Sequence, residues 1–267
     1  MRLESADKHY AEITEINPDA QIEVRVEKGR AFFVVENFLS RPDDFKEFLL
    51  AQAHWENKID STGFSRPGKS ALLPLKMGDF ISEYLSSIFG VDAFGIHSVY
   101  TNCMNGDMKV SERRKWPHTD GLGHNFLAAN IFLSETCHGG TGFWSFDDGT
   151  KPEPYPSMHH LNTFDKNKIL RLTESKVLTD WEQYDSIDEW KLDYVLEHKY
   201  NSFFVYSGML FHNPYIPPTS YLEEDRFSFV TMLNPSESYN LIDSNPEVQQ
   251  QYEKLREIFY LTIPNFR

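Results

Sequence analysis

A spaced set of three metal-ligating residues constrains the fold of this 267-residue chain more than any other feature. His118 and Asp120 are two positions apart, and His212 follows much later in the chain. Residues i and i+2 share one face of a β-strand but point about 200° apart on a helix. His118 and Asp120 can therefore reach one metal only from an extended segment. Two imidazoles and one carboxylate can hold a divalent metal on one side and leave the other positions open.

A second triplet of this kind, His54-Trp55-Glu56, shows that the spacing alone is weak evidence. The chain has 10 His and 40 Asp plus Glu, so about one or two such triplets are expected by chance. His54 follows residues 42–50, whose apolar positions recur at helical spacing. Pro117, before His118, favours a strand edge because proline has no amide donor. The context favours His118 and Asp120.

The segments around this set have the pattern of β-strands. Residues 125–134 are mostly apolar and are followed by a glycine turn and a second candidate strand at 139–146. Residues 201–208 form another such strand, and residues 226–233 alternate polar and apolar side chains. Both patterns are typical of strands that bury one or both faces.

With these pieces in this order, the chain resembles the Fe(II)/2-oxoglutarate-dependent dioxygenases, in particular their prolyl-4-hydroxylase-like branch. The resemblance is carried by Pro-His-Thr-Asp, by an apolar strand ending in Gly-Gly-Thr-Gly-Phe, by Ser-Gly-x-x-x-His and by an Arg-x-Ser strand. It implies a mainly β fold of the α+β class. Its core would be a double-stranded β-helix, which is a jelly-roll or cupin-like barrel, with flanking helices. It also implies Fe(II) bound by His118, Asp120 and His212, with 2-oxoglutarate and O2 as co-substrates.

Four further residues are candidates for binding the co-substrate. Arg226 would bind the distal carboxylate of 2-oxoglutarate, because a guanidinium matches a carboxylate and stays charged when buried. Ser228 shares its strand face and can add a hydrogen bond. Thr141 and Asn130 are candidates for polar contacts with co-substrate or substrate. Residues 103–106 stand where many relatives place a tyrosine that helps to hold the co-substrate. The alternative for Arg226 is an exposed arginine paired with an acidic neighbour.

The resemblance implies that 2-oxoglutarate is decarboxylated to succinate and CO2 while an unactivated C–H bond is hydroxylated. The substrate would be an amino acid, a peptide or protein side chain, or a small metabolite. Two other classes stay open. One is a cupin-like metal barrel with non-oxidative chemistry, in which Arg226 would have no role. The other is a non-catalytic barrel that binds a ligand or partner, against which the intact metal triad argues.

The length favours one domain over residues 1–267. The jelly-roll core is expected at about 93–233, interrupted by an insertion or lid at 148–192 that carries Trp181, Tyr184 and Trp190. Further elements are expected outside this core: strands at 22–26 and 32–35, and helices at 42–53, 77–89 and about 245–260.

The bulk properties exclude several kinds of partner. The net charge of −14 argues against nucleic acid and against an anionic membrane surface. No apolar run approaches the length of a membrane span, and the first residues have no secretory pattern. Cys103 and Cys137 are expected to be free thiols in a reducing, cytoplasmic compartment. The sequence leaves the oligomeric state open.

Overall fold

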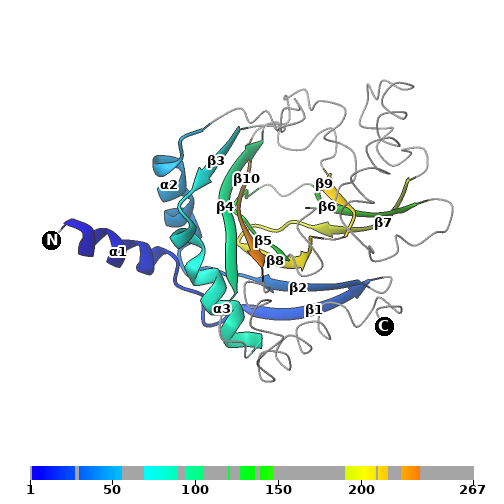
Figure 1. The fold of residues 1–267 in the computed structure, drawn as a ribbon, viewed down its shortest axis with the longest axis horizontal. Coiled ribbons are helices and arrows are strands. Elements are labelled where there is room, and N and C mark those ends of the chain that lie inside the picture. The colour runs from blue at the N-terminus through cyan, green and yellow to red at the C-terminus, as the bar shows by residue number, and fades with distance from the viewer. Residues whose placement is uncertain are drawn as a thin grey trace, which may run out of the picture.

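The computed structural model describes residues 2–27, 30–55, 69–89, 94–104, 120, 127–135, 139–146, 190–208, 210–215 and 224–234. In this part of the chain two antiparallel sheets pack against each other (Figure 1). The seven-stranded sheet has the order β1-β2-β8-β5-β10-β4-β3, and the three-stranded sheet has the order β7-β6-β9. The strands are β1 (Gln21–Glu27), β2 (Arg30–Glu36), β3 (Lys69–Leu73), β4 (Gly95–Met104), β5 (Leu127–Phe132), β6 (Gly140–Phe146), β7 (Trp190–Glu197), β8 (Ser202–Ser207), β9 (His212–Tyr215) and β10 (Arg226–Asn234).

The strand order is that of a double-stranded β-helix. The chain passes from the large sheet to the small one after β5, returns after β7, and crosses twice more at β9 and β10. Strands distant in sequence therefore become neighbours, as β10 does between β4 and β5. The predicted jelly-roll fold is confirmed.

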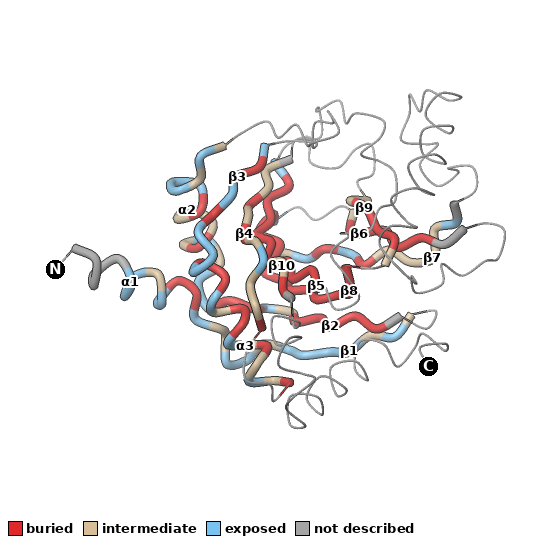
Figure 2. Tube along the Cα trace, viewed as in Figure 1, coloured by how far each residue is buried: buried red, intermediate tan, exposed pale blue. Residues whose placement is uncertain are grey.

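The central strands β5 and β8 are buried on both faces, which explains their nearly continuous apolar sequences. Alternate side chains enter two separate apolar clusters. Ile131 and Phe203 belong to the cluster under the helices. Phe132 and Phe204 belong to the cluster between the sheets, where they meet Phe143 of β6. Figure 2 shows this buried centre against the exposed edge strand β1.

Helices cover the outer face of the large sheet (Figure 1). They are α1 (Arg2–Ile13), α2 (Pro42–Gln52), the 3-10 helix η1 (Leu75–Gly78) and α3 (Asp79–Phe89). Phe45 of α2 packs edge-on against Phe229 of β10, with ring centroids 5.2 Å apart. No helix in the described ranges is long and apolar enough to cross a membrane.

The expected early strands and the helices at 42–53 and 77–89 are confirmed, whereas α1 and β3 were not expected. One boundary was wrong. Residues 190–192, assigned to the insertion, are the first three residues of β7. β7 lies at the edge of its sheet, so charged residues such as Lys191 and Asp193 interrupt the apolar pattern that marks a buried strand. The rest of the insertion and the expected C-terminal helix lie outside the described residues.

Asn201, in the turn between β7 and β8, ties the N-terminal segment to the barrel. Its φ of 54° is in the left-handed region that asparagine tolerates. Its Oδ1 accepts a hydrogen bond from the Leu39 amide and its Nδ2 donates to the Leu39 carbonyl, both at 2.9 Å. Its own amide donates to the Phe132 carbonyl at 2.8 Å. One buried side chain therefore satisfies both polar groups of a distant residue.

Replacing Asn201 with alanine should lower the free energy of unfolding by about 2–4 kcal/mol, because two buried backbone groups of Leu39 lose their partners. Urea unfolding followed by circular dichroism measures the loss. Asn17→Ala is the matched control, since the Asn17 side chain accepts its hydrogen bond from the exposed Asp19 amide, and its cost should be about 1 kcal/mol or less. Equal losses in the two variants would contradict this role for Asn201.

Candidate functional site

Asp120 and His212, two of the three predicted metal ligands, lie side by side in the structure. His212 begins β9, and its Nε2 is 3.6 Å from Oδ2 of Asp120. The Asp120 amide donates to the Gly208 carbonyl at 2.8 Å, which holds this residue beside the turn between β8 and β9. The side chain of Asp120 is only 12 % exposed, and that of His212 only 7 %. The third predicted ligand, His118, lies outside the described residues.

The geometry of the pair fits a divalent metal. The Nδ1 of His212 lies 2.8 Å from the Leu210 carbonyl oxygen. An oxygen acceptor there requires that Nδ1 carries a proton, which leaves Nε2, the nitrogen that faces Asp120, as the one that can bind a metal. A second ring nitrogen held by a backbone carbonyl is the usual support of a metal-ligating histidine. Two ligands about 2.1 Å from one metal lie about 3.0–3.5 Å apart, close to the observed separation. Within the described ranges no group of three metal-ligating residues occurs.

Aromatic side chains enclose the pair. The ring of Tyr206 lies 5.1 Å from that of His212, and Phe143 lies 6.2 Å from it, measured between ring centroids. Burial raises the pKa of Tyr206 well above its usual value, and the nearby Asp120 charge raises it further. Tyr206 therefore remains a neutral phenol beside the predicted metal ligands.

Arg226, the first residue of β10, points into the space between the sheets. Its neighbour Phe227 and the next odd residue, Phe229, belong to the cluster under the helices, so Arg226 and Ser228 face the other way. Arg226 is 6 % exposed, which rules out the exposed arginine of the alternative interpretation. Its guanidinium carbon lies 5.1 Å from the centroid of the Phe132 ring.

His198, just after β7, connects Arg226 to Thr141. Its Nδ1 is 3.4 Å from Nη2 of Arg226, and its Nε2 is 2.9 Å from Oγ1 of Thr141. Its ring stacks on Phe132, with centroids 3.4 Å apart and an interplanar angle of 18°. Burial lowers the pKa of His198 well below its usual value, and the Arg226 charge lowers it further. The ring is therefore neutral at physiological pH.

The other predicted co-substrate residues share this interior. Thr141, Asn130 and Ser228 are 5 %, 8 % and 1 % exposed. Asn130 lies against the Tyr206 hydroxyl and lowers its pKa slightly, but among the described residues its Nδ2 makes no hydrogen bond of normal geometry. Because a buried amide donor is costly to leave unpaired, a ligand in the barrel would offset that cost.

Sequence reasoning missed two further groups of the site. His198 lies beyond an edge strand and follows no motif, so nothing in the sequence distinguishes it from a surface histidine. Residues 103–106 carry no tyrosine where many relatives place one, but Tyr100 lies earlier on the same strand, β4, and pairs with Val230 of β10. The two phenols of Tyr100 and Tyr206 interact electrostatically when ionised, which adds to the raised pKa of Tyr206. Both tyrosines lie on strands of the seven-stranded sheet, Tyr100 on β4 and Tyr206 on β8.

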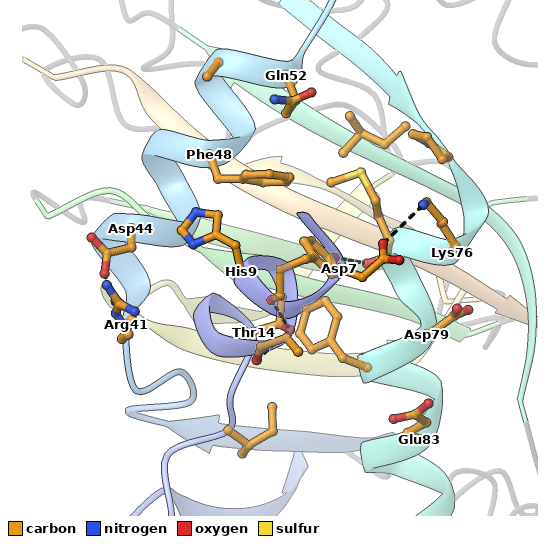
Figure 3. A pocket seen from close by; sticks show the side chains of 18 of the residues that line it. Asp7, His9, Thr14, Arg41, Asp44, Phe48, Gln52, Lys76, Asp79 and Glu83 are labelled. Atoms are coloured by element: carbon orange, nitrogen blue, oxygen red, sulfur yellow. Dashed lines mark hydrogen bonds and ion pairs between the residues drawn. The ribbon is translucent and has the colours of Figure 1, made fainter. Parts of the chain in front are cut away.

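A separate hollow of about 1420 Å³ lies among the helices, on the other side of the large sheet (Figure 3). Acidic and basic side chains from α1, α2, η1 and α3 and from the residue before α2 line it together, among them Asp7, Arg41, Asp44, Lys76, Asp79 and Glu83. The Tyr10 hydroxyl donates to the Met77 carbonyl at 2.6 Å and holds α1 over it. None of the predicted site residues that the structure describes lines this hollow, so it is distinct from the barrel interior.

Fold and interior together define a double-stranded β-helix protein with a carboxylate–imidazole pair and a buried arginine inside the barrel. The chain belongs to a family of unknown function (DUF6445), whose model matches residues 17–228. No curated protein matches the chain.

Several solved structures are similar to this chain in fold. They include the non-heme alpha ketoglutarate dependent epimerase SnoN from nogalamycin biosynthesis, with a TM-score of 0.44, 10 % identity and coverage of 87 % of this chain and 83 % of that one. The carbocyclase SnoK from the same biosynthesis has a TM-score of 0.45, 11 % identity and coverage of 82 % and 88 %. HygX from Streptomyces hygroscopicus, with nickel and 2-oxoglutarate bound, has a TM-score of 0.44, 11 % identity and coverage of 77 % and 83 %. Likenesses this distant carry no argument about activity.

Replacing Asp120 or His212 with alanine should weaken binding of Ni(II), used as a stable probe, by more than about 100-fold, because a metal ligand is lost outright. Calorimetric titration measures the affinity. His54→Ala is the matched control, since His54 belongs to the second triplet and is exposed. Unchanged Ni(II) affinity in both site variants would contradict the metal assignment.

His198 should make the fold sensitive to acid. The folded protein keeps this imidazole neutral, whereas the unfolded chain binds a proton below about pH 6.5. The free energy of unfolding therefore decreases as the pH falls through this value, by about 1.4 kcal/mol between pH 7.5 and 5.5, because only the unfolded chain takes up the proton. His198→Gln should remove this part of the loss, as measured by urea unfolding at both pH values. His9→Gln, at an exposed histidine, should retain the wild-type pH dependence. An identical pH dependence in His198→Gln and wild type would contradict a neutral His198.

Proposed function

We propose that this protein is a non-haem Fe(II) and 2-oxoglutarate-dependent oxygenase that hydroxylates an unactivated C–H bond. One observation carries the proposal: a carboxylate–imidazole pair and a buried arginine line the interior of the same barrel. The alternative function, a metal barrel with non-oxidative chemistry, does not explain why an arginine is buried at this position. The sequence resemblance to the prolyl-4-hydroxylase-like branch supports the same conclusion.

The metal would be held by Asp120 and His212, together with His118. Iron bound there would supply the O2 chemistry that couples decarboxylation of 2-oxoglutarate to oxidation of the substrate. The Leu210 carbonyl holds the His212 ring, and the Gly208 carbonyl holds the Asp120 backbone. These two residues are therefore held in place before a metal binds, which lowers the cost of binding it.

The co-substrate would be held through its distal carboxylate by Arg226. A buried guanidinium in surroundings of low polarity attracts a carboxylate much more strongly than an exposed one. The face of Phe132 supports the guanidinium plane. Ser228, Thr141 and Asn130 face the same interior and would add neutral hydrogen bonds to co-substrate or substrate.

The aromatic residues around the metal pair would exclude water. Tyr206 and Phe143 contact the His212 ring, and the apolar cluster between the sheets continues behind them. A dry site strengthens its electrostatic contacts and limits side reactions. The substrate proposed for this site is a small metabolite, or a side chain presented by a peptide or protein.

Arg226→Ala should raise the 2-oxoglutarate concentration needed for half-maximal turnover by at least about 30-fold. Loss of a buried charge pair costs roughly 2–5 kcal/mol. Release of succinate and CO2 measures turnover, and anaerobic Fe(II) with 2-oxoglutarate should give a weak visible absorption that tests binding directly. Iron should remain bound to the variant.

Arg41→Ala is the matched control, because Arg41 is exposed and pairs with Asp44 on the helical side. It should leave the 2-oxoglutarate requirement unchanged. If Arg226→Ala also leaves it unchanged, the carboxylate is held elsewhere. If the wild-type protein neither decarboxylates 2-oxoglutarate nor gives the absorption, the proposed function is wrong.

A further inference from the structure

The ring of His198 is buried and is fixed in position by contacts on several sides. It is 2 % exposed, and residues of three different strands contact its ring: Phe132 of β5, Thr141 of β6 and Arg226 of β10. The stack on Phe132 fixes the ring plane, and the two nitrogen contacts fix its rotation in that plane. No motif, and no part of the proposed metal site, accounts for this arrangement.

The contacts determine which ring nitrogen carries the proton. Arginine can only donate hydrogen bonds, so the Nδ1 that faces Arg226 must present its lone pair. The neutral ring then carries its hydrogen on Nε2 and donates it to Thr141 Oγ1, 2.9 Å away. Because this oxygen accepts from His198, the hydroxyl hydrogen of Thr141 must point elsewhere. Thr141 and Phe143 share the β6 face that packs between the sheets, so that hydrogen is available to the barrel interior.

We propose that His198 is a positioning residue of the co-substrate site: it orients the Arg226 guanidinium and turns the Thr141 hydroxyl into a donor toward the barrel interior. The two donors then converge on one carboxylate. The inference rests on the proposed function, because that carboxylate is the distal one of a 2-oxo dicarboxylate. His198 itself touches neither the co-substrate nor the metal.

The chemistry of imidazole explains why this position would be a histidine. The ring accepts from an arginine on one side and donates to a hydroxyl on the other while carrying no charge. A carboxylate here would neutralise Arg226 and repel the incoming co-substrate, and an ammonium would repel Arg226. Among uncharged side chains, glutamine also offers an acceptor and a donor on one planar group, whereas leucine offers neither.

This difference gives a direct test with His198→Gln and His198→Leu. Calorimetry would measure 2-oxoglutarate binding to the full chain loaded with Ni(II). His198→Leu should weaken binding about tenfold or more, since a donor to a charged group is lost. His198→Gln should stay within about threefold of wild type. In turnover, the KM for 2-oxoglutarate should rise in His198→Leu, while kcat at saturating co-substrate should change little.

A double-mutant cycle tests whether His198 acts through Thr141. Thr141→Val should weaken binding by itself, and adding His198→Leu to it should cost much less than in the wild-type background. If the two effects instead multiply, the residues act independently and the inference is wrong. It is also wrong if His198→Gln binds as weakly as His198→Leu, because the ring would then serve only as packing against Phe132.

Two outcomes separate this inference from the proposed function. If wild-type protein binds Ni(II) but no 2-oxoglutarate, the proposed function is wrong and the inference falls with it. If wild type binds 2-oxoglutarate and all His198 variants bind it equally, only the inference is wrong. Should His198→Leu not fold, Thr141→Ser and Thr141→Val give the same contrast, and equal affinities in that pair would overturn the inference.

Discussion

The burial of β5 and β8 on both faces is the constraint on which the rest of this structure depends. Apolar side chains leave one face of these strands for the helices and the other for the small sheet. Each layer therefore loses its main apolar contact surface if the central strands shift by one residue, because a one-residue slip exchanges the two faces. The register that keeps Phe132 and Phe204 between the sheets also sets Asn130 and Tyr206 facing the barrel interior.

The barrel interior is lined mainly by apolar side chains and contains a few buried polar groups. Burial restricts each of these polar groups to a small set of partners. Arg226 lies over an aromatic face beside a neutral imidazole, so its immediate aromatic neighbours orient the cation without neutralising it. Burial keeps His198 uncharged, and its contact with Arg226 determines its tautomer and hence the direction of its hydrogen bond with Thr141. In water a donor that loses its partner can bond to a water molecule instead, but inside the barrel an unpaired donor is costly. Each donor is therefore held to one direction.

The carboxylate–imidazole pair of Asp120 and His212 depends on the connection between β8 and β9. Asp120 is hydrogen-bonded to the Gly208 carbonyl, far away in sequence, and His212 to the nearby Leu210 carbonyl, so the same short connection holds both residues. Asn201 links the other end of β8 to the N-terminal segment through Leu39. Strand β8 thus connects the N-terminal segment at one end with the Asp120 and His212 pair at the other.

The sequence by itself determined the strand pattern, the fold class and most of the interior polar residues. Alternation and apolar runs are local signals, and residues such as Arg226 and Ser228 fall on one face of a strand by simple periodicity. The tertiary structure alone decided that His198 and Tyr206 belong to the site, and that β7 begins at Trp190. An edge strand carries little hydrophobic pattern, and the histidine beyond its end meets Phe132, Thr141 and Arg226 only when β5, β6 and β10 surround it. Such contacts join residues far apart in the chain, and local sequence does not encode them.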